Sequence, residues 1–286
     1  MRDPTPLRDA LAALVGITDR RPDCDPPAVG REARGDGFVR SEVTYRDSDG
    51  TPIPAVLVAP IGAGPFPGAV VFHPHDPGRC HLGKSGVEGL AIELARRGIV
   101  VLAPDARGYE DRRIGGSGTA PHPSDALQHW NAVAHALVVG DTLARRVIDD
   151  GLRAVSMLSD HPAVIRGTVG VLGSGGPLAL FVAALDARVR WCVADRGVVS
   201  YRQALLRGLP IDPSLLVPGI ANVVELDDVI GLLAPRPTLL VSTEGDPSDT
   251  ARMVKGGWAG LHHLKLRPGA HPGEAIVRWV AERRAG

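Results

Sequence analysis

Short, mostly apolar segments alternate along this chain with segments whose apolar residues recur at helical spacing. The segments of strand length cover 69–72, 99–102, 168–172, 189–194 and 239–242. The segments expected to be helical cover 89–97, 140–160, 178–185, 201–207 and 275–283. A strand that is apolar at nearly every position is buried on both faces, which is typical of a parallel sheet covered by helices. We therefore predict an α/β fold with a mostly parallel, twisted sheet, right-handed crossovers and helices on both faces.

The first part of the chain has a different pattern. Residues 1–37 are predicted to be an N-terminal arm, made of an amphipathic helix over 5–17 and then a proline-rich surface linker. Residues 38–46 alternate apolar and polar side chains, and turn residues separate them from a second strand over 53–58. These two strands are expected to form an antiparallel hairpin at the start of a main domain that covers 38–286.

The composition excludes several classes of protein. The 32 basic residues balance the 32 acidic residues, so bulk charge does not favour binding to nucleic acid or to a membrane surface. No apolar run reaches the length of a membrane span, and Arg8 and Asp9 interrupt any signal peptide. The three cysteines are few and far apart, which favours a reducing compartment. We expect a cytoplasmic protein whose partner is a small-molecule substrate; the sequence leaves its oligomeric state open, including a homo-oligomer.

Candidate catalytic residues follow the predicted strands. Ligands of such sheets bind beyond the carboxyl ends of the strands. Ser174 follows one strand, Asp246 follows another, and His271 precedes the last predicted helix. A serine hydroxyl becomes a nucleophile when a histidine takes its proton and a carboxylate orients that histidine. Asp195, which ends the neighbouring strand, is an alternative acid, although a salt bridge to Arg196 would also explain it.

Several stretches carry a resemblance to a known family. They are His73-Pro74-His75 followed by Gly83-Lys84-Ser85, Val100–Asp105, Ala183–Val189 and Ala234–Pro237. From about residue 38 to 280 the chain resembles the α/β-hydrolase superfamily, in particular its bacterial branch near dienelactone hydrolases and acetyl-xylan esterases. The resemblance implies hydrolysis of an ester, lactone or other acyl bond without a metal or organic cofactor. It also implies the chain order serine, acid, histidine that the three candidates show.

The turn around the serine departs from the family pattern G-x-S-x-G. Leu172 stands where a small residue is expected. Alignment on the preceding strand puts Gly175 in the position of the nucleophile, and alignment on the following helix puts Gly173 there. Two interpretations stay open: a shortened turn in which Ser174 works, or a lost or displaced nucleophile. The second interpretation would make the protein a non-hydrolytic cyclase or lyase of a biosynthetic pathway, or a binding protein.

Two backbone amides are candidates for the oxyanion hole, the pair of donors that stabilises the charge developing on the substrate oxygen. They belong to Gly175 and His75, because Pro74 has no N–H group. His73 and His75 also suggest a metal site. No third ligand with suitable spacing follows them, so we expect no metal and assign His73 to the wall of the pocket.

The long segment 107–131 is predicted to be an insertion that covers the pocket. Arg107, Tyr109 and Trp130 are its candidate pocket residues. Its arginines could hold a substrate carboxylate, and a solvated basic loop is the simpler alternative.

A nucleotide-binding site is a further alternative, because glycines at 170, 173, 175 and 176 follow a strand. Asp195 lies about 20 residues beyond Gly175, as in a dinucleotide-binding fingerprint. Leu178 replaces a glycine that this fingerprint requires, which argues against it.

Overall fold

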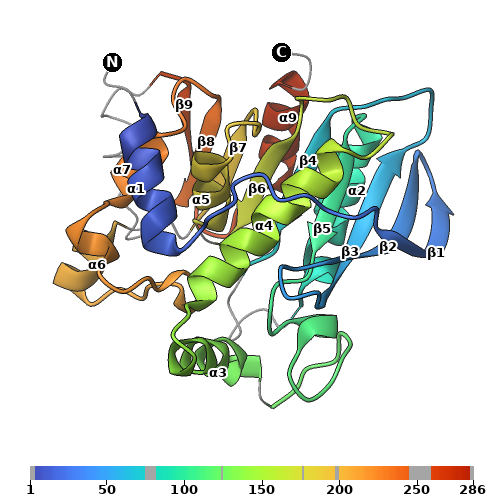
Figure 1. The fold of residues 1–286 in the computed structure, drawn as a ribbon. Coiled ribbons are helices and arrows are strands. Elements are labelled where there is room, and N and C mark those ends of the chain that lie inside the picture. Colours follow the sequence, from blue (N-terminus) through green and yellow to red (C-terminus); the bar gives the residue numbers. More distant parts are fainter. Residues whose placement is uncertain are drawn as a thin grey trace.

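The computed structural model describes residues 4–74, 82–123, 125–175, 177–196, 200–244 and 259–283. Within these residues, nine strands form one sheet, and helices lie on both of its faces (Figure 1). The strands are β1 (Ala28–Gly35), β2 (Phe38–Arg46), β3 (Pro52–Pro60), β4 (Gly68–Phe72), β5 (Val100–Pro104), β6 (Gly170–Ser174), β7 (Cys192–Asp195), β8 (Thr238–Thr243) and β9 (Leu261–Leu266). The helices are α1 (Thr5–Val15), α2 (Glu88–Arg96), α3 (Asp125–Val138), α4 (Leu143–Ser159), α5 (Leu178–Leu185), α6 (Tyr201–Arg207), α7 (Leu226–Gly231) and α9 (Gly273–Arg283).

The order of the strands is β1-β2-β3-β5-β4-β6-β7-β8-β9. From β1 to β5 the neighbours in this order are antiparallel, and from β5 to β9 they are parallel. The prediction of a mostly parallel sheet with an antiparallel hairpin at its start is confirmed. In the parallel part the carboxyl ends of β4, β6, β7 and β8 share one edge, where such sheets bind their ligands.

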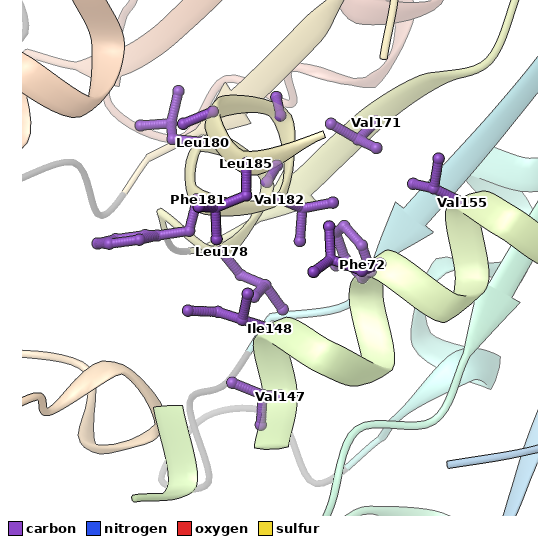
Figure 2. Packing of buried hydrophobic residues seen from close by; sticks show 14 of the residues in the cluster. Phe72, Val147, Ile148, Val155, Val171, Leu178, Leu180, Phe181, Val182 and Leu185 are labelled. Carbon is purple, nitrogen blue, oxygen red and sulfur yellow. The ribbon is translucent and has the colours of Figure 1, made fainter. Parts of the chain in front are cut away.

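Each face of the sheet has its own apolar core because the central parallel strands β4 and β5 are apolar and buried at every position. In β4, Val70 and Phe72 pack with α1, α4 and α5, whereas Ala69 and Val71 pack with α2 and α9. Figure 2 shows Phe72 between α4 and α5. Gly151 of α4 permits this packing, because a β-carbon there would lie 2.6 Å from a methyl group of Val182. None of the helices described is long and apolar enough to cross a membrane.

The N-terminal segment is part of the sheet and of its core. The prediction of a linker up to residue 37 is wrong for β1, which pairs antiparallel with β2. Nearly all of β1 is exposed, so it has no apolar pattern that would reveal a strand. Helix α1 buries Leu11, Ala12 and Val15 in the same core as α4 and α5. Residues 4–37 therefore pack on the main domain.

Candidate functional site

Ser174 is the last residue of β6, whereas the sequence suggested a turn beyond the strand. Side chains alternate along a strand, so Ser174 faces the same side of the sheet as Leu172, toward α2 and α9. It pairs in register with Asp195, the last residue of β7. The Ser174 hydroxyl donates a hydrogen bond to Oδ2 of Asp195 at 3.4 Å. The two predicted strand ends thus lie side by side.

Ser174 and His271 line one cavity of about 380 Å³. Asp195 and Arg196 line it as well. Its walls come from the 3₁₀ turn before α2, from α2 and the residue after it, and from the start of α9, and they comprise Gly86, Val87, Gly89, Leu90, Glu93, Arg97, Pro272, Gly273, Glu274, Ile276 and Val277. His271 lies two residues before α9, so the beginning of this helix places the imidazole at the edge of the sheet where β6 and β7 end. Residues separated by almost a hundred positions therefore meet at one site.

Asp195 and Arg196 form a two-pronged ion pair at this cavity. Nε and Nη2 of Arg196 donate to Oδ1 and Oδ2 of Asp195 at 3.0 and 2.9 Å. The Asp195 side chain is only 4% exposed, whereas that of Arg196 is 45% exposed. The backbone of Arg196 has a φ of 64°, which lies in the left-handed region that side-chain-bearing residues rarely adopt. The salt bridge that the sequence suggested for Asp195 is present, together with its bond from Ser174.

Gly175 follows Ser174 in a left-handed conformation, with a φ of 82°. Its amide donates to the backbone oxygen of Asp195 at 2.7 Å, which extends the ladder between β6 and β7 by one residue. This bond contradicts the prediction that the Gly175 amide is an oxyanion donor. A β-carbon at Gly175 would also lie 2.8 Å from Cβ of Pro74. This position therefore has no room for a nucleophilic side chain.

His73 lies at the end of β4 and is buried. Its Nε2 accepts a hydrogen bond from the amide of Ala106 at 2.9 Å, and its Nδ1 is 3.1 Å from the Pro74 carbonyl, to which it donates. Burial lowers the pKa of His73 to about 4, so the ring is neutral at pH 7. With Ser174 and Gly175 it lines a second, small cavity of about 10 Å³.

Asp212 also lines this small cavity, and sequence analysis did not find it. Burial raises the pKa of its carboxyl to about 6, despite hydrogen bonds from the amide and hydroxyl of Ser214. The residue lies between α6 and the short 3₁₀ turn Pro213–Leu215, so no strand end marked it as a candidate.

A buried cluster around Lys84 supports one wall of the larger cavity. Nζ of Lys84 lies 2.6 Å from Asp105, 3.0 Å from Glu110 and 2.7 Å from Asp111. Glu110 also accepts hydrogen bonds from the backbone amides on both sides of Lys84. These contacts anchor the 3₁₀ turn Lys84–Val87 to the segment after β5, and this turn supplies two residues of the cavity wall. The sequence marked Lys84 only through the family resemblance.

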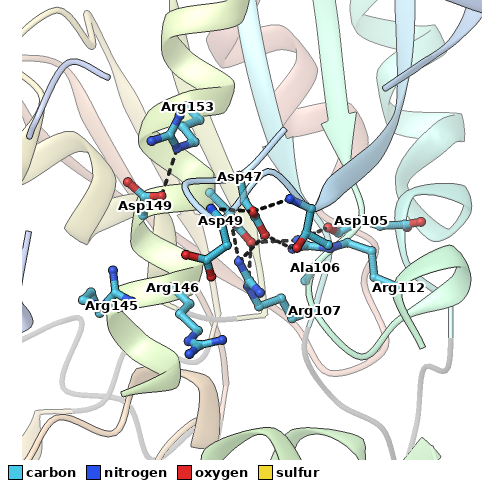
Figure 3. A network of polar contacts seen from close by, with 12 residues as sticks. Asp47, Asp49, Asp105, Ala106, Arg107, Arg112, Arg145, Arg146, Asp149 and Arg153 are labelled. Carbon is cyan, nitrogen blue, oxygen red and sulfur yellow. Dashed lines mark hydrogen bonds and ion pairs between the residues drawn. The ribbon is translucent and has the colours of Figure 1, made fainter. Parts of the chain in front are cut away.

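Arg107 is held in a network of ion pairs away from the Ser174 cavity. It pairs with Asp47 at 2.6 Å and with Asp150 at 3.1 Å. Arg112 also contacts both carboxylates, Asp47 at 3.5 Å and Asp150 at 2.7 Å. Figure 3 shows Arg107, Arg112 and Asp47 of this network. The side chains of Arg112 and Asp47 are almost fully buried. Both arginines are therefore paired with carboxylates of the protein itself. This contradicts the prediction that they hold a substrate carboxylate, and it also contradicts the alternative of a solvated basic loop.

Tyr109 and Trp130 have different surroundings. The ring of Tyr109 is buried and packs edge-on against His73 and His129, with centroid distances of 4.7 and 5.0 Å. Trp130 lies on α3 and is 53% exposed. As far as the chain is described, no residue of 107–131 lines the cavity of Ser174 and His271. The expectation that this insertion covers the pocket therefore does not match the cavity found.

Two predicted site residues, Asp246 and His75, lie outside the described residues. The assignments of Asp246 as the acid and of the His75 amide as an oxyanion donor stay predictions.

Comparison with known proteins places this geometry in context. The family acetyl xylan esterase (AXE1) matches residues 36–205, more than half of the chain. The Bacillus subtilis (strain 168) protein "Putative hydrolase YtaP" is 29% identical over 305 residues, covering 96% of each chain. The acetyl xylan esterase from Paenibacillus sp. R4 superposes with a TM-score of 0.65 at 18% identity, covering 99% of this chain and 95% of the other. A "putative acetyl xylan esterase" from Bacteroides fragilis NCTC 9343 gives 0.72 at 13% identity, covering 92% and 74%. At identities this low, the similarity to these two solved structures shows a shared fold and nothing more specific.

Proposed function

Because the chain belongs to the acetyl xylan esterase (AXE1) family of α/β-hydrolases, we propose that it hydrolyses a small-molecule ester with Ser174 as nucleophile. Its class, a carboxylic ester hydrolase, follows from the family; the nucleophile and the substrate are our inference. One observation carries this inference: Ser174 and His271 line the same cavity at the edge of the sheet. No side chain fits at Gly175, which favours Ser174 over a nucleophile displaced to that position.

The proposed reaction has two halves. His271 takes the proton of the Ser174 hydroxyl while the oxygen attacks the ester carbonyl, and the alcohol leaves with a proton from His271. Water, activated by the same imidazole, then hydrolyses the acyl-enzyme and restores the serine. A carboxylate must orient His271. Both oxygens of Asp195 already accept bonds from Arg196, and one also accepts from Ser174. This supports Asp246 as the orienting acid.

The cavity limits the substrate. Its volume of about 380 Å³ is near the lower end of the range for small-molecule sites, roughly 300–1,000 Å³. The structural relative from Paenibacillus sp. R4 is named for the removal of acetyl groups. We therefore propose a short acyl group, such as acetyl, on a small alcohol.

The test is the loss of turnover in Ser174→Ala. With p-nitrophenyl acetate as substrate, we expect Ser174→Ala and His271→Ala each to abolish measurable turnover. Ser174→Ala should also lose covalent labelling by a fluorophosphonate, which reacts with activated serines. Ser48→Ala, at an exposed serine in the turn between β2 and β3, is the control and should keep both activities.

A different result would contradict the proposal. If Ser174→Ala turned over the ester and was still labelled, another residue would be the nucleophile. If only His271→Ala lost activity, the imidazole would act on water or substrate directly.

A further inference from the structure

The cavity shared by Ser174 and His271 continues between helices α2 and α9. Its lining residues on α2 and at the ends of this helix recur every three or four positions, so they lie on one face of the helix. A helix rises 1.5 Å per residue, so this face extends over about 12 Å from Gly89 to Arg97. Helix α2 leads back toward the start of β5, so the cavity extends away from the edge where Ser174 lies.

The walls of the cavity are apolar between the two helices. Val87 and Leu90 line it from one side, and Ile276 and Val277 line it from the other. Its charged lining residues on the two helices are exposed and lie at the rim; they are Glu93, Arg97 and Glu274. Walls of this kind suit the apolar part of a ligand, whereas polar groups at one end orient it.

The proposed reaction indicates which part of an ester would lie between the helices. The alcohol oxygen takes a proton from His271 as it leaves, so the alcohol must lie beside this imidazole. His271 is followed by the residues at the start of α9 that line the cavity, from Gly273 to Val277. An alcohol held beside His271 is therefore next to the space between α2 and α9.

We propose that this space binds the alcohol part of the ester, and that Leu90 selects an alcohol with an apolar body, such as an aromatic ring. The inference deepens the proposed function and rests on it, because the position of the alcohol follows from the role of His271. It assigns specificity to a helix that the sequence marked only by its periodicity.

Leu90 differs from the other apolar residues of the walls in its exposure. Val87, Ile276 and Val277 are at most 5% exposed and belong to the core below the cavity. Leu90 is half-buried, so more of its surface is available to a ligand. Gly89 beside it has no atom within 4 Å of an added β-carbon, which leaves the cavity open there.

The test compares two pairs of esters on the full chain. 2-Naphthyl acetate and phenyl acetate share the acyl group and differ in the alcohol, whereas phenyl butyrate and phenyl acetate share the alcohol and differ in the acyl group. The ratio of kcat/KM within each pair is measured for each variant. Both esters of a pair meet the same preparation, so a partly unfolded variant leaves the ratio unchanged.

Two variants alter the wall in opposite ways. Leu90→Ala removes apolar surface, and Gly89→Phe fills the space beside it. We expect each variant to lower the naphthyl-to-phenyl ratio by about 10-fold or more, as for other changes in apolar pockets, and to leave the butyrate-to-acetate ratio unchanged.

Matched controls make the same substitutions outside this cavity. Leu205→Ala changes an exposed leucine of α6, and Gly116→Phe changes a glycine whose added β-carbon also has open space. Both controls should keep both ratios. If Leu90→Ala and Gly89→Phe changed the butyrate-to-acetate ratio, alone or together with the other ratio, the proposal would be overturned. A naphthyl-to-phenyl ratio that stayed the same or rose would also overturn it.

Binding of 2-naphthol, the alcohol product, tests the same contact without turnover. We expect calorimetry to detect 2-naphthol on Ser174→Ala and to show a Kd about 10-fold higher on Ser174→Ala/Leu90→Ala. Equal Kd values would overturn the role of Leu90.

Failure of this inference is distinguishable from failure of the proposed function. If Ser174→Ala is inactive and the ratios of Leu90→Ala and Gly89→Phe are unchanged, the serine mechanism stands and only the role of Leu90 falls. If Ser174→Ala still hydrolyses the esters, the serine mechanism itself falls, and the naphthol measurement decides separately whether Leu90 contacts such an alcohol.

Discussion

Gly175 lies against Pro74 so closely that a β-carbon added to the glycine would be 2.8 Å from Cβ of the proline. The contact joins the end of β6 to the segment after β4, and the glycine has a φ of 82°. Both features require a glycine immediately after the candidate nucleophile. This explains why the turn carries Gly175 where alignment on the strand would place a nucleophile.

Gly175→Ala should therefore destabilise the protein and disturb the site. The left-handed conformation alone costs a residue with a side chain about 1–2 kcal/mol, and the clash should add about 1–3 kcal/mol to the loss in free energy of unfolding. Gly167→Ala is the matched control, since Gly167 has a φ of 77° and open space around its added β-carbon. Urea unfolding measures both variants. Equal losses would show that Pro74 does not restrict this position.

Lys84→Met should be strongly destabilising. Burial acts to lower the pKa of Lys84, but its three carboxylate neighbours outweigh burial and hold the pKa above its ordinary value. Without the ammonium group the buried carboxylates are left uncompensated, at a loss of about 3–5 kcal/mol in the free energy of unfolding.

The double variant Lys84→Met/Asp105→Asn should recover part of this stability, because it removes one of the orphaned charges. Arg20→Ala, which breaks an exposed ion pair with Asp9, should change stability by less than about 1 kcal/mol. A loss for Lys84→Met as small as that of Arg20→Ala would show that the cluster contributes no stability.

Acid should destabilise the native protein through His73. Burial lowers its pKa from 6.5 to about 4, so below pH 6.5 the unfolded chain binds a proton that the folded chain excludes. This contribution is absent above pH 6.5 and grows as the pH falls toward 4. At pH 5 it amounts to about 2 kcal/mol.

His73→Gln keeps a donor and an acceptor in the side chain but does not titrate. We expect the stability of the unaltered protein to fall relative to this variant by about 2 kcal/mol between pH 7 and pH 5. Taking the difference between the two proteins cancels the opposite effect of Asp105 and Asp212, whose pKa values burial raises to about 6. A difference that does not vary with pH would show that His73 titrates normally.

Arg107→Met tests whether this arginine binds substrate or supports the fold. Arg107 pairs with Asp47 and Asp150, and Arg112 remains to compensate both carboxylates. We expect a loss of about 1.5–3 kcal/mol in the free energy of unfolding. The values of kcat and KM should be unchanged, both for p-nitrophenyl acetate and for a half-ester that carries a carboxylate. A raised KM for the half-ester alone would restore the substrate-binding role that the sequence suggested.

The alternation of apolar strands and helices was sufficient to predict the layers of the fold. Helix α5 and strand β2 have the boundaries that periodicity indicated, because a buried strand or helix face leaves a local apolar pattern. Strands β1 and β9 escaped prediction because their positions at the two edges of the sheet leave most of their side chains exposed or half-buried. An edge strand pairs through its backbone, which no side-chain pattern records.

The order of residues along the chain predicted Ser174, Asp246 and His271 as the catalytic residues, with Asp195 as an alternative acid. Of these, the structure places Ser174, Asp195 and His271 on one cavity, and Asp246 lies outside the described residues. Only the tertiary structure decided which groups contact one another there. Three contacts depend on backbone angles and on packing between distant segments. They are the hydrogen bond of the Gly175 amide to Asp195, the two-pronged ion pair of Arg196 with Asp195, and the position of Lys84 among three carboxylates. The periodicity of apolar residues shows which face of a helix or strand is buried. Chemistry at a site depends instead on the direction of single hydrogen-bond donors and acceptors, and the packing of the whole chain sets that direction.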